Sequence, residues 1–183
     1  MFNLPNILAL IRIVLAPLLF WVLLNPTYFT DSGMHITWVH YFASLLFVLA
    51  SATDFFDGHI ARELDQVTML GKILDPLADK MLTLAAFLGL MISGEASAWA
   101  IYIIIVRELF ITGLRTVAVG ENLDISASMA GKVKTVMQMI AIGFLIMHFP
   151  FATELLWLAV AITLYSGGEF VYGFSKAFKG ESK

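Results

Sequence analysis

Residues 54–79 read DFFDGHIARELDQVTMLGKILDPLAD, and acidic side chains interrupt an otherwise apolar chain there. Four of its aspartates form two pairs by their spacing, Asp54 with Asp57 and Asp75 with Asp79. Separations of three and four residues put the members of each pair on one face of a helix. The polar segment 58–74 is predicted to be a hairpin that turns the second pair back toward the first. Carboxylates gathered in apolar surroundings need cations, because desolvating unpaired charge is costly, and hard divalent ions such as Mg²⁺ or Mn²⁺ suit oxygen ligands.

The composition of the whole chain is that of a membrane protein. Of its 183 residues, 60% are apolar and only 14% are charged, which is too apolar for a soluble domain. The chain has no cysteine, so disulfides and thiol chemistry are excluded. The net charge of −3 identifies no partner, and no nucleic-acid partner is expected. Because no internal repeat and no separate polar domain is visible, residues 1–183 are predicted to form one domain.

Long apolar segments predict an all-α integral membrane protein with six transmembrane helices in one bundle. The expected spans are residues 7–24, 37–56, 75–92, 99–119, 133–149 and 155–174. The third span is predicted to begin at Asp75 as its N-cap, because Pro76 suits the first helical position. Lysine and arginine are confined to one side of this topology, so the positive-inside rule places both termini and the aspartates in the cytoplasm.

The full spacing of the stretch is Asp-x2-Asp-Gly-x2-Ala-Arg-x8-Gly-x3-Asp-x3-Asp. It is carried by Asp54, Asp57, Gly58, Ala61, Arg62, Gly71, Asp75 and Asp79. This pattern resembles, without a departure, the signature of the CDP-alcohol phosphotransferases, membrane enzymes that move a phosphatidyl-type group from a CDP-linked donor to an alcohol and release CMP. The resemblance implies that the four aspartates hold two divalent cations, Mg²⁺ or Mn²⁺, and that Asp79 is also the general base.

The resemblance also implies a set of contacts to the donor, CDP-diacylglycerol. The implied residues are Asn6, Gly58, Ala61, Arg62, Thr68 and Gly71. The two glycines would leave room for the cytidine, with helix packing as the alternative reading, and Arg62 would contact the donor phosphates or hold the carboxylates. The chain departs from the usual pattern at Ala9, where threonine is common. The missing hydroxyl puts one donor or headgroup contact in doubt.

A second set of charged residues lies in and beside the fourth and fifth predicted spans: Arg107, Arg115, Lys132 and Lys134. An arginine in mid-membrane must face a partner or a polar cavity. Glu108 is not expected to be that partner, because it lies about 100° further round the helix. The four cations predict a basic pocket beside the aspartates that binds the phosphate of the acceptor alcohol, although the two lysines could simply be inside-facing charges.

Segments 105–115 and 131–139 are similar to those of bacterial family members that use glycerol 3-phosphate. The resemblance therefore implies transfer of the phosphatidyl group of CDP-diacylglycerol to glycerol 3-phosphate, giving phosphatidylglycerophosphate and CMP. It also implies a homodimer in the bacterial cytoplasmic membrane, with the active site facing the cytoplasm. Within the family, the alternative acceptors are inositol phosphate and phosphatidylglycerol. A cation transporter with an acidic site is the alternative from another class, but transporter sites usually lie at the midplane between repeated halves.

Overall fold

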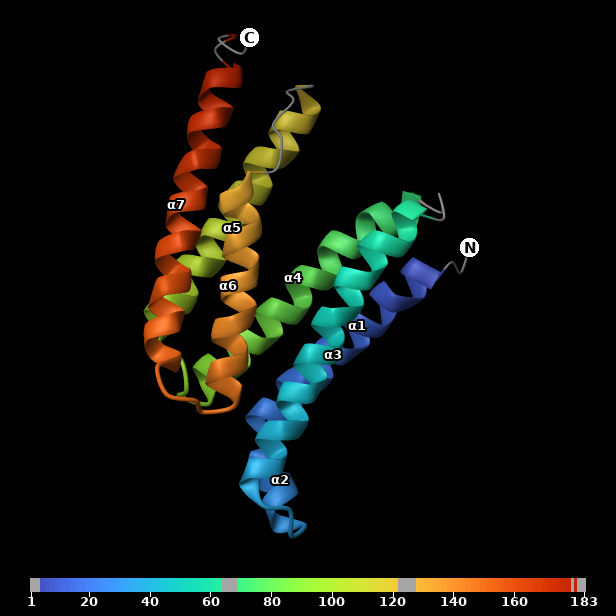
Figure 1. Cartoon of the computed structure of the whole chain (residues 1–183), viewed down its shortest axis with the longest axis vertical. Helices are drawn as coiled ribbons and strands as arrows, with labels where there is room; N and C mark the ends of the chain where they lie inside the picture. The colour runs from blue at the N-terminus through green and yellow to red at the C-terminus, as the bar shows by residue number, and fades with distance from the viewer. Residues whose placement is uncertain (1–3, 64–68, 122–127, 179, 181–183) are drawn as a thin grey trace. The chain divides into compact units, whose positions relative to one another are not determined.

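The computed structural model describes residues 4–63, 69–121, 128–178 and 180, shown as ribbons in Figure 1. Side chains are described for these residues except 4–6, 53–63, 69–76 and 79. The described part contains helices and no strand, which confirms the all-α prediction. The helices are α1 (Leu4–Leu24), α2 (Pro26–Asp31), α3 (Ile36–Glu63), α4 (Met69–Ile92), α5 (Ala98–Gly120), α6 (Met129–Ile146) and α7 (Ala152–Phe178).

Helices lie at all six of the predicted span positions. In the described part, three segments are long and apolar enough to cross a membrane: Ile7–Leu24, Met129–Ile146 and Ala152–Phe178. Shorter apolar segments occupy Ile36–Ala52 of α3 and Lys80–Ile92 of α4. The 23-residue helix α5 has the length of a span but carries three charged side chains inside it, Arg107, Glu108 and Arg115. Six crossings of the membrane therefore stay a prediction.

The polar hairpin is shorter than the sequence predicted. Helix α3 continues to Glu63 and α4 begins at Met69, so segments 58–63 and 69–74 are helical. Asp75 is consequently not an N-cap, because it lies inside α4, and Pro76 follows it within the same helix. The prediction was wrong because the polarity of 58–63 was taken to mean a loop and 69–74 was included in it, whereas both segments contain strong helix formers such as alanine, arginine, glutamate, methionine and leucine.

Two other boundaries also differ from the prediction. The expected loop at 25–36 contains the short helix α2, which begins at Pro26, a residue that favours the first position of a helix. Helix α6 begins at Met129, four residues before the predicted start of the fifth span. The Ser128 hydroxyl caps this helix by accepting a hydrogen bond from the backbone N–H of Gly131 at 3.2 Å.

The chain divides into two compact units. The first unit comprises Met1–Glu95 and Ile142–Phe149. In it α1 packs against α4 and α3 (Figure 1), and the contact is close because small residues line it: Ala9, Ala16, Ala78, Ala86 and Gly89 are buried. A Cβ atom at Gly89 would lie 2.8 Å from Leu23 Cδ1, so the two helices approach at that glycine. The Arg12 side chain is also enclosed here, with no exposed surface.

A polar contact joins three segments of the first unit. His148 Nε2 lies 2.9 Å from Glu95 Oε2, and its Nδ1 lies 3.2 Å from the carbonyl oxygen of Ile146. The ring of His148 stacks on that of His40 with a centroid distance of 4.2 Å. The turn after α4 is thereby linked to the end of α6 and to α3.

The second unit comprises Ala96–Ala141 and Pro150–Lys183. Helices α5 and α7 pack against each other in it, and α6 joins them through polar contacts. Its interior is apolar at Ile101, Ile104 and Leu156, but it also encloses several polar side chains. These polar side chains gather around Arg107.

Candidate functional site

The four aspartates lie on two helices of the first unit that are in contact. Asp54 and Asp57 belong to α3, and Asp75 and Asp79 belong to α4. Because both segments are helical throughout, the members of each pair share one helix face, as the spacing predicted. Their side chains lie outside the described ones, so the shared metal site stays a prediction.

The residues implied for donor binding are distributed over three helices. Asn6 lies in α1, Gly58, Ala61 and Arg62 lie in α3, and Gly71 lies in α4, while Thr68 is outside the described residues. All five described positions are helical, so Gly58 and Gly71 belong to regular helix and not to a hairpin loop. Ala9, at the position where threonine is common, is completely buried in α1. A methyl group fills that site without leaving a polar atom to satisfy.

Arg107 is the centre of a buried polar cluster in the second unit. Its side chain is 11% exposed, and both terminal nitrogens make hydrogen bonds. Nη1 donates to Glu108 Oε1 at 3.2 Å, and Nη2 donates to Ser166 Oγ on α7 at 2.7 Å. The expectation that Glu108 is not a partner was wrong. The Cα–Cβ bonds of the two residues point in different directions, but their side chains are long enough for the charged ends to meet.

Glu108 also binds Lys134 of α6. Lys134 Nζ donates to the same carboxylate oxygen at 2.5 Å, and only 8% of Lys134 is exposed. Glu108 therefore bridges a cation on its own helix and a cation on α6. The trio carries two positive charges and one negative charge, so it is net positive. Its side chains are largely shielded from water, which strengthens electrostatic interactions there.

The other two predicted basic residues are more exposed. Arg115 places its guanidinium carbon 5.5 Å from the centre of the Phe170 ring on α7, a cation–π contact. Lys132 is exposed near the start of α6. Of the four predicted acceptor residues, the structure thus links Arg107 and Lys134, because both bind the carboxylate of Glu108.

A second layer of polar contacts supports the trio from α6 and α7. Gln138 Nε2 donates to Thr163 Oγ1 at 3.0 Å, and Ser166 Oγ donates to the carbonyl oxygen of Thr163 at 3.2 Å. All three side chains are at least 96% buried. Sequence reasoning missed Glu108, Thr163 and Ser166. The signal for the last two was their spacing of three residues in an apolar helix, which puts two hydroxyls on one face.

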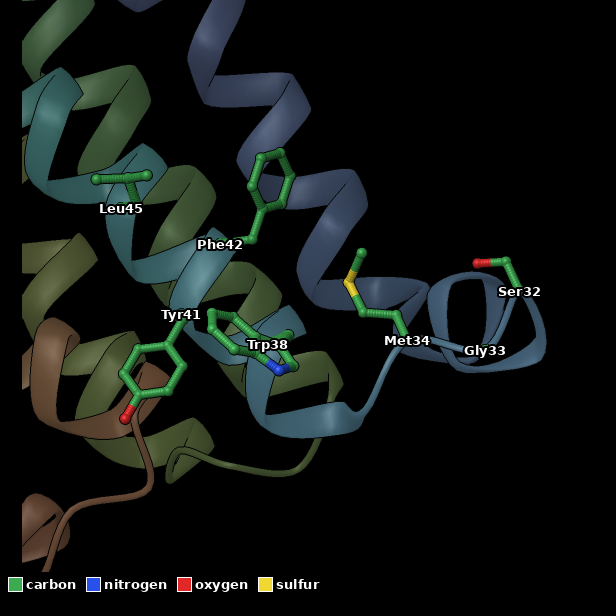
Figure 2. Close-up of a pocket in the computed structure, with 7 residues that line it drawn as sticks. All are labelled: Ser32, Gly33, Met34, Trp38, Tyr41, Phe42 and Leu45. Carbon is green, nitrogen blue, oxygen red and sulfur yellow. The ribbon is translucent and has the colours of Figure 1, made fainter.

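An apolar pocket of about 660 Å³ lies elsewhere in the first unit (Figure 2). It is lined by Ser32, Gly33, Met34, Trp38, Tyr41, Phe42 and Leu45. Figure 2 shows Ser32, Gly33 and Met34 on the segment that follows α2, and the other four lining residues along the first turns of α3. Its lining has no acidic or basic side chain, so it offers no charged group to a metal or a phosphate.

Comparisons with known proteins agree with the motif. The profile of the family described as CDP-alcohol phosphatidyltransferase matches residues 2–165. A relative from Bacillus subtilis (strain 168), named CDP-diacylglycerol--glycerol-3-phosphate 3-phosphatidyltransferase, is 43% identical over 96% of this chain and 95% of its own. Relatives with the same name from Rickettsia bellii and Escherichia coli (strain K12) are each 33% identical, over 97% and 90% of this chain and 96% and 91% of their own. A match that spans nearly the whole chain shows that it belongs to the CDP-alcohol phosphatidyltransferase family.

Proposed function

We propose that this protein transfers the phosphatidyl group of CDP-diacylglycerol to glycerol 3-phosphate, giving phosphatidylglycerophosphate and CMP. Family membership supports the reaction class, and the shared name of relatives that match over almost their full length supports the substrates. The structural observation that carries the choice of acceptor is the buried, net positive trio of Arg107, Glu108 and Lys134.

The aspartates suit divalent cations by the chemistry of their donor set. Carboxylates paired by helical spacing on two contacting helices provide hard oxygen ligands without competing sulfur or nitrogen. We assign Asp54, Asp57, Asp75 and Asp79 to hold two ions, Mg²⁺ or Mn²⁺. When bound, such ions neutralise charge on the donor diphosphate as the bond to CMP breaks.

The chain's own side chains then have separate tasks. Asp79 accepts the proton of the acceptor hydroxyl, and the oxygen of that hydroxyl attacks the phosphorus that carries the diacylglycerol group. The bond between this phosphorus and the oxygen of CMP then breaks. Arg62 contacts the donor phosphates, and Gly58 and Gly71 leave the cytidine room against the helix backbones. Asn6, Ala61 and Thr68 complete the proposed donor contacts.

The acceptor phosphate is assigned to Arg107 and Lys134. Arginine can donate two parallel hydrogen bonds to a phosphate, and lysine adds a point charge. Arg115 and Lys132 are more exposed and add positive charge that attracts an anionic acceptor. A free phosphate monoester fits this arrangement better than an uncharged alcohol, since buried cations gain most from an anion that reaches them.

The setting proposed for this reaction is the bacterial cytoplasmic membrane. Helices at all six predicted span positions support six crossings, and the one-sided distribution of lysine and arginine supports cytoplasmic termini and a cytoplasmic active site. We also propose that residues 1–183 act as one catalytic domain and that the protein is a homodimer.

An acceptor panel tests the proposal. Purified protein is given labelled CDP-diacylglycerol, Mg²⁺ or Mn²⁺, and in turn glycerol 3-phosphate, glycerol, serine, inositol phosphate or phosphatidylglycerol, and CMP release is measured. Only glycerol 3-phosphate should support turnover. Equal use of any other acceptor would reassign the substrate, while the family-level reaction would remain.

Point variants link that result to the trio. Arg107→Ala and Lys134→Ala should each raise the KM for glycerol 3-phosphate roughly ten- to a hundredfold, the effect of losing one charge-assisted hydrogen bond. The KM for CDP-diacylglycerol should change little. Lys176→Ala, at an exposed lysine in the last turn of α7, is the matched control. If Arg107→Ala and Lys134→Ala behave like this control, the trio does not bind the acceptor.

A further inference from the structure

The way in which Arg107 is held points to a role for α7, a helix that supplies none of the charged residues assigned above. We propose that Ser166 and Gly167 are positioning residues that fix the guanidinium of Arg107 in the orientation that receives the acceptor phosphate. This inference rests on the proposed function, because it assumes that Arg107 binds that phosphate.

Ser166 presents a fixed acceptor to Arg107. Its hydroxyl has one proton, and that proton is donated to the carbonyl oxygen of Thr163 at 3.2 Å. The lone pairs of Oγ are therefore free to accept from Arg107 Nη2 at 2.7 Å, and an arginine can only donate. Because Ser166 is 1% exposed, no bulk water competes for this hydrogen bond.

Gly167 gives the arginine side chain its space. A Cβ atom at this position would lie 3.1 Å from Arg107 Nε and 3.3 Å from Arg107 Cγ, closer than ordinary van der Waals contact. The arginine thus lies directly on the backbone of α7. Its Nε–H is buried and has no hydrogen-bond partner among the described residues, which fits an edge pressed against a helix surface.

These contacts use three of the five N–H donors of the guanidinium. Arginine has five N–H donors, of which Nε–H faces α7 and one on each terminal nitrogen is used by Glu108 and Ser166. The two remaining hydrogens belong to Nη1 and Nη2. The position of a phosphate bound by these hydrogens would depend on how Ser166 and Gly167 hold the guanidinium. A guanidinium that is already held in its binding orientation loses less conformational entropy when phosphate binds.

Substitution of Gly167 by alanine tests this role most directly, because the new methyl group would press against the side chain of Arg107. A shift of a few tenths of an ångström is needed to accept the new methyl group. Both terminal nitrogens are tied, so that shift stretches the bonds to Ser166 and Glu108. Gly168→Ala is a matched control, since a Cβ atom there meets nothing within 4 Å and the chemical change in the same helix is identical.

The experiment measures the KM for each substrate, kcat and the thermal midpoint for Ser166→Ala, Gly167→Ala and Gly168→Ala, each alone and combined with Arg107→Ala. Ser166→Ala and Gly167→Ala should raise the KM for glycerol 3-phosphate about three- to tenfold, as expected for a weakened hydrogen bond to a charged group. The KM for CDP-diacylglycerol should stay within about twofold. In the Arg107→Ala background neither substitution should have a further effect, because the residue through which they act is gone.

The outcomes separate this inference from the proposed function. If Arg107→Ala raises the KM for glycerol 3-phosphate while Ser166→Ala and Gly167→Ala match Gly168→Ala, the positioning role is overturned and the acceptor assignment stands. If Arg107→Ala leaves that KM unchanged, the acceptor assignment fails and the positioning role fails with it. A further rise in the Arg107→Ala background would show action independent of Arg107 and also overturn the inference. Should Gly167→Ala not fold, Ser166→Ala decides by the same readouts.

Discussion

Glu108→Gln removes the only charge in the Arg107–Glu108–Lys134 trio that opposes the two cations, while it keeps the shape of the side chain. In the native protein one carboxylate oxygen accepts from Arg107 Nη1 at 3.2 Å and from Lys134 Nζ at 2.5 Å. The amide oxygen of glutamine can still accept hydrogen bonds, but it carries no charge. Arg107 and Lys134 then remain close together and enclosed, and the charge of Glu108 no longer opposes their mutual repulsion.

The size of the effect follows from the two contacts and their burial. A hydrogen bond to a charged group contributes about 1.5–3 kcal/mol, and breaking a buried ion pair costs about 3–5 kcal/mol. The Glu108 side chain is 24% exposed, so water recovers part of that loss. We therefore expect the free energy of unfolding to fall by about 2–4 kcal/mol. For a chain of this length that corresponds to a lower thermal midpoint by about 5–15 °C.

The assay is thermal unfolding of the purified protein in one detergent, with and without inorganic phosphate. Glu169→Gln makes the same chemical change at an exposed position of α7 and serves as the control. Phosphate should stabilise Glu108→Gln more than the native protein, because the anion supplies the missing negative charge to the two cations. The reasoning is refuted if Glu108→Gln unfolds at the same temperature as Glu169→Gln.

Three further predictions concern the aspartates, the topology and the packing of α1. Asparagine at each of Asp54, Asp57, Asp75 and Asp79 should nearly abolish CMP release, as should a chelator, and substantial activity in chelator would contradict the two-metal mechanism. Asp79→Asn should retain metal better than Asp75→Asn, since Asp79 is proposed to act chiefly as the base, and equal metal loss would remove that distinction. In this cysteine-free chain Ser32→Cys should react with an impermeant thiol reagent from outside the cell and Ser182→Cys should not, whereas the reverse pattern would invert the topology. Gly89→Ala should lower stability by about 1–3 kcal/mol, because the new methyl group would lie 2.8 Å from Leu23 Cδ1 and 3.1 Å from Leu23 Cβ; Gly143→Ala, with nothing within 4 Å, should not.

The positions of the helices were predictable because each apolar run is long. The first predicted span and the apolar segment of α1 coincide at residues 7–24, and α4 ends at Ile92 as expected. Polar boundaries were less predictable. Segment 58–63 is polar enough to resemble a loop, and hydropathy alone does not distinguish a polar helix from a loop. Segment 69–74 was assigned to the same hairpin although it is mostly apolar, and its residues favour helix.

The charged residues show a different limit of sequence reasoning. Arg107 and Lys134 were expected to lie near each other, and they do, because each is a long cation in an apolar helix that needs a partner. The identity of that partner was missed, since helical periodicity gives the direction of the Cβ atom and not the reach of the side chain. The contribution of Ser166 was not predicted, because the face of α7 that meets α5 depends on how the two helices pack together and cannot be read from one helix alone.

Each aspartate pair lies inside a continuous helix, and the regular geometry of that helix fixes the distances and directions between the motif residues on it. Residues 69–74 place about 9 Å of helix before Asp75, and α3 extends beyond Asp57 to Glu63. One residue inserted between Asp75 and Asp79 would turn Asp79 by about 100°, and its carboxylate would leave the shared face. One residue inserted elsewhere in either helix would turn a whole pair by about 100° relative to the rest of that helix. Among relatives, the two helical parts of the motif should therefore accept substitutions at many positions but conserve their lengths. Because the signature also fixes eight residues between Arg62 and Gly71, insertions and deletions should be absent from the whole motif.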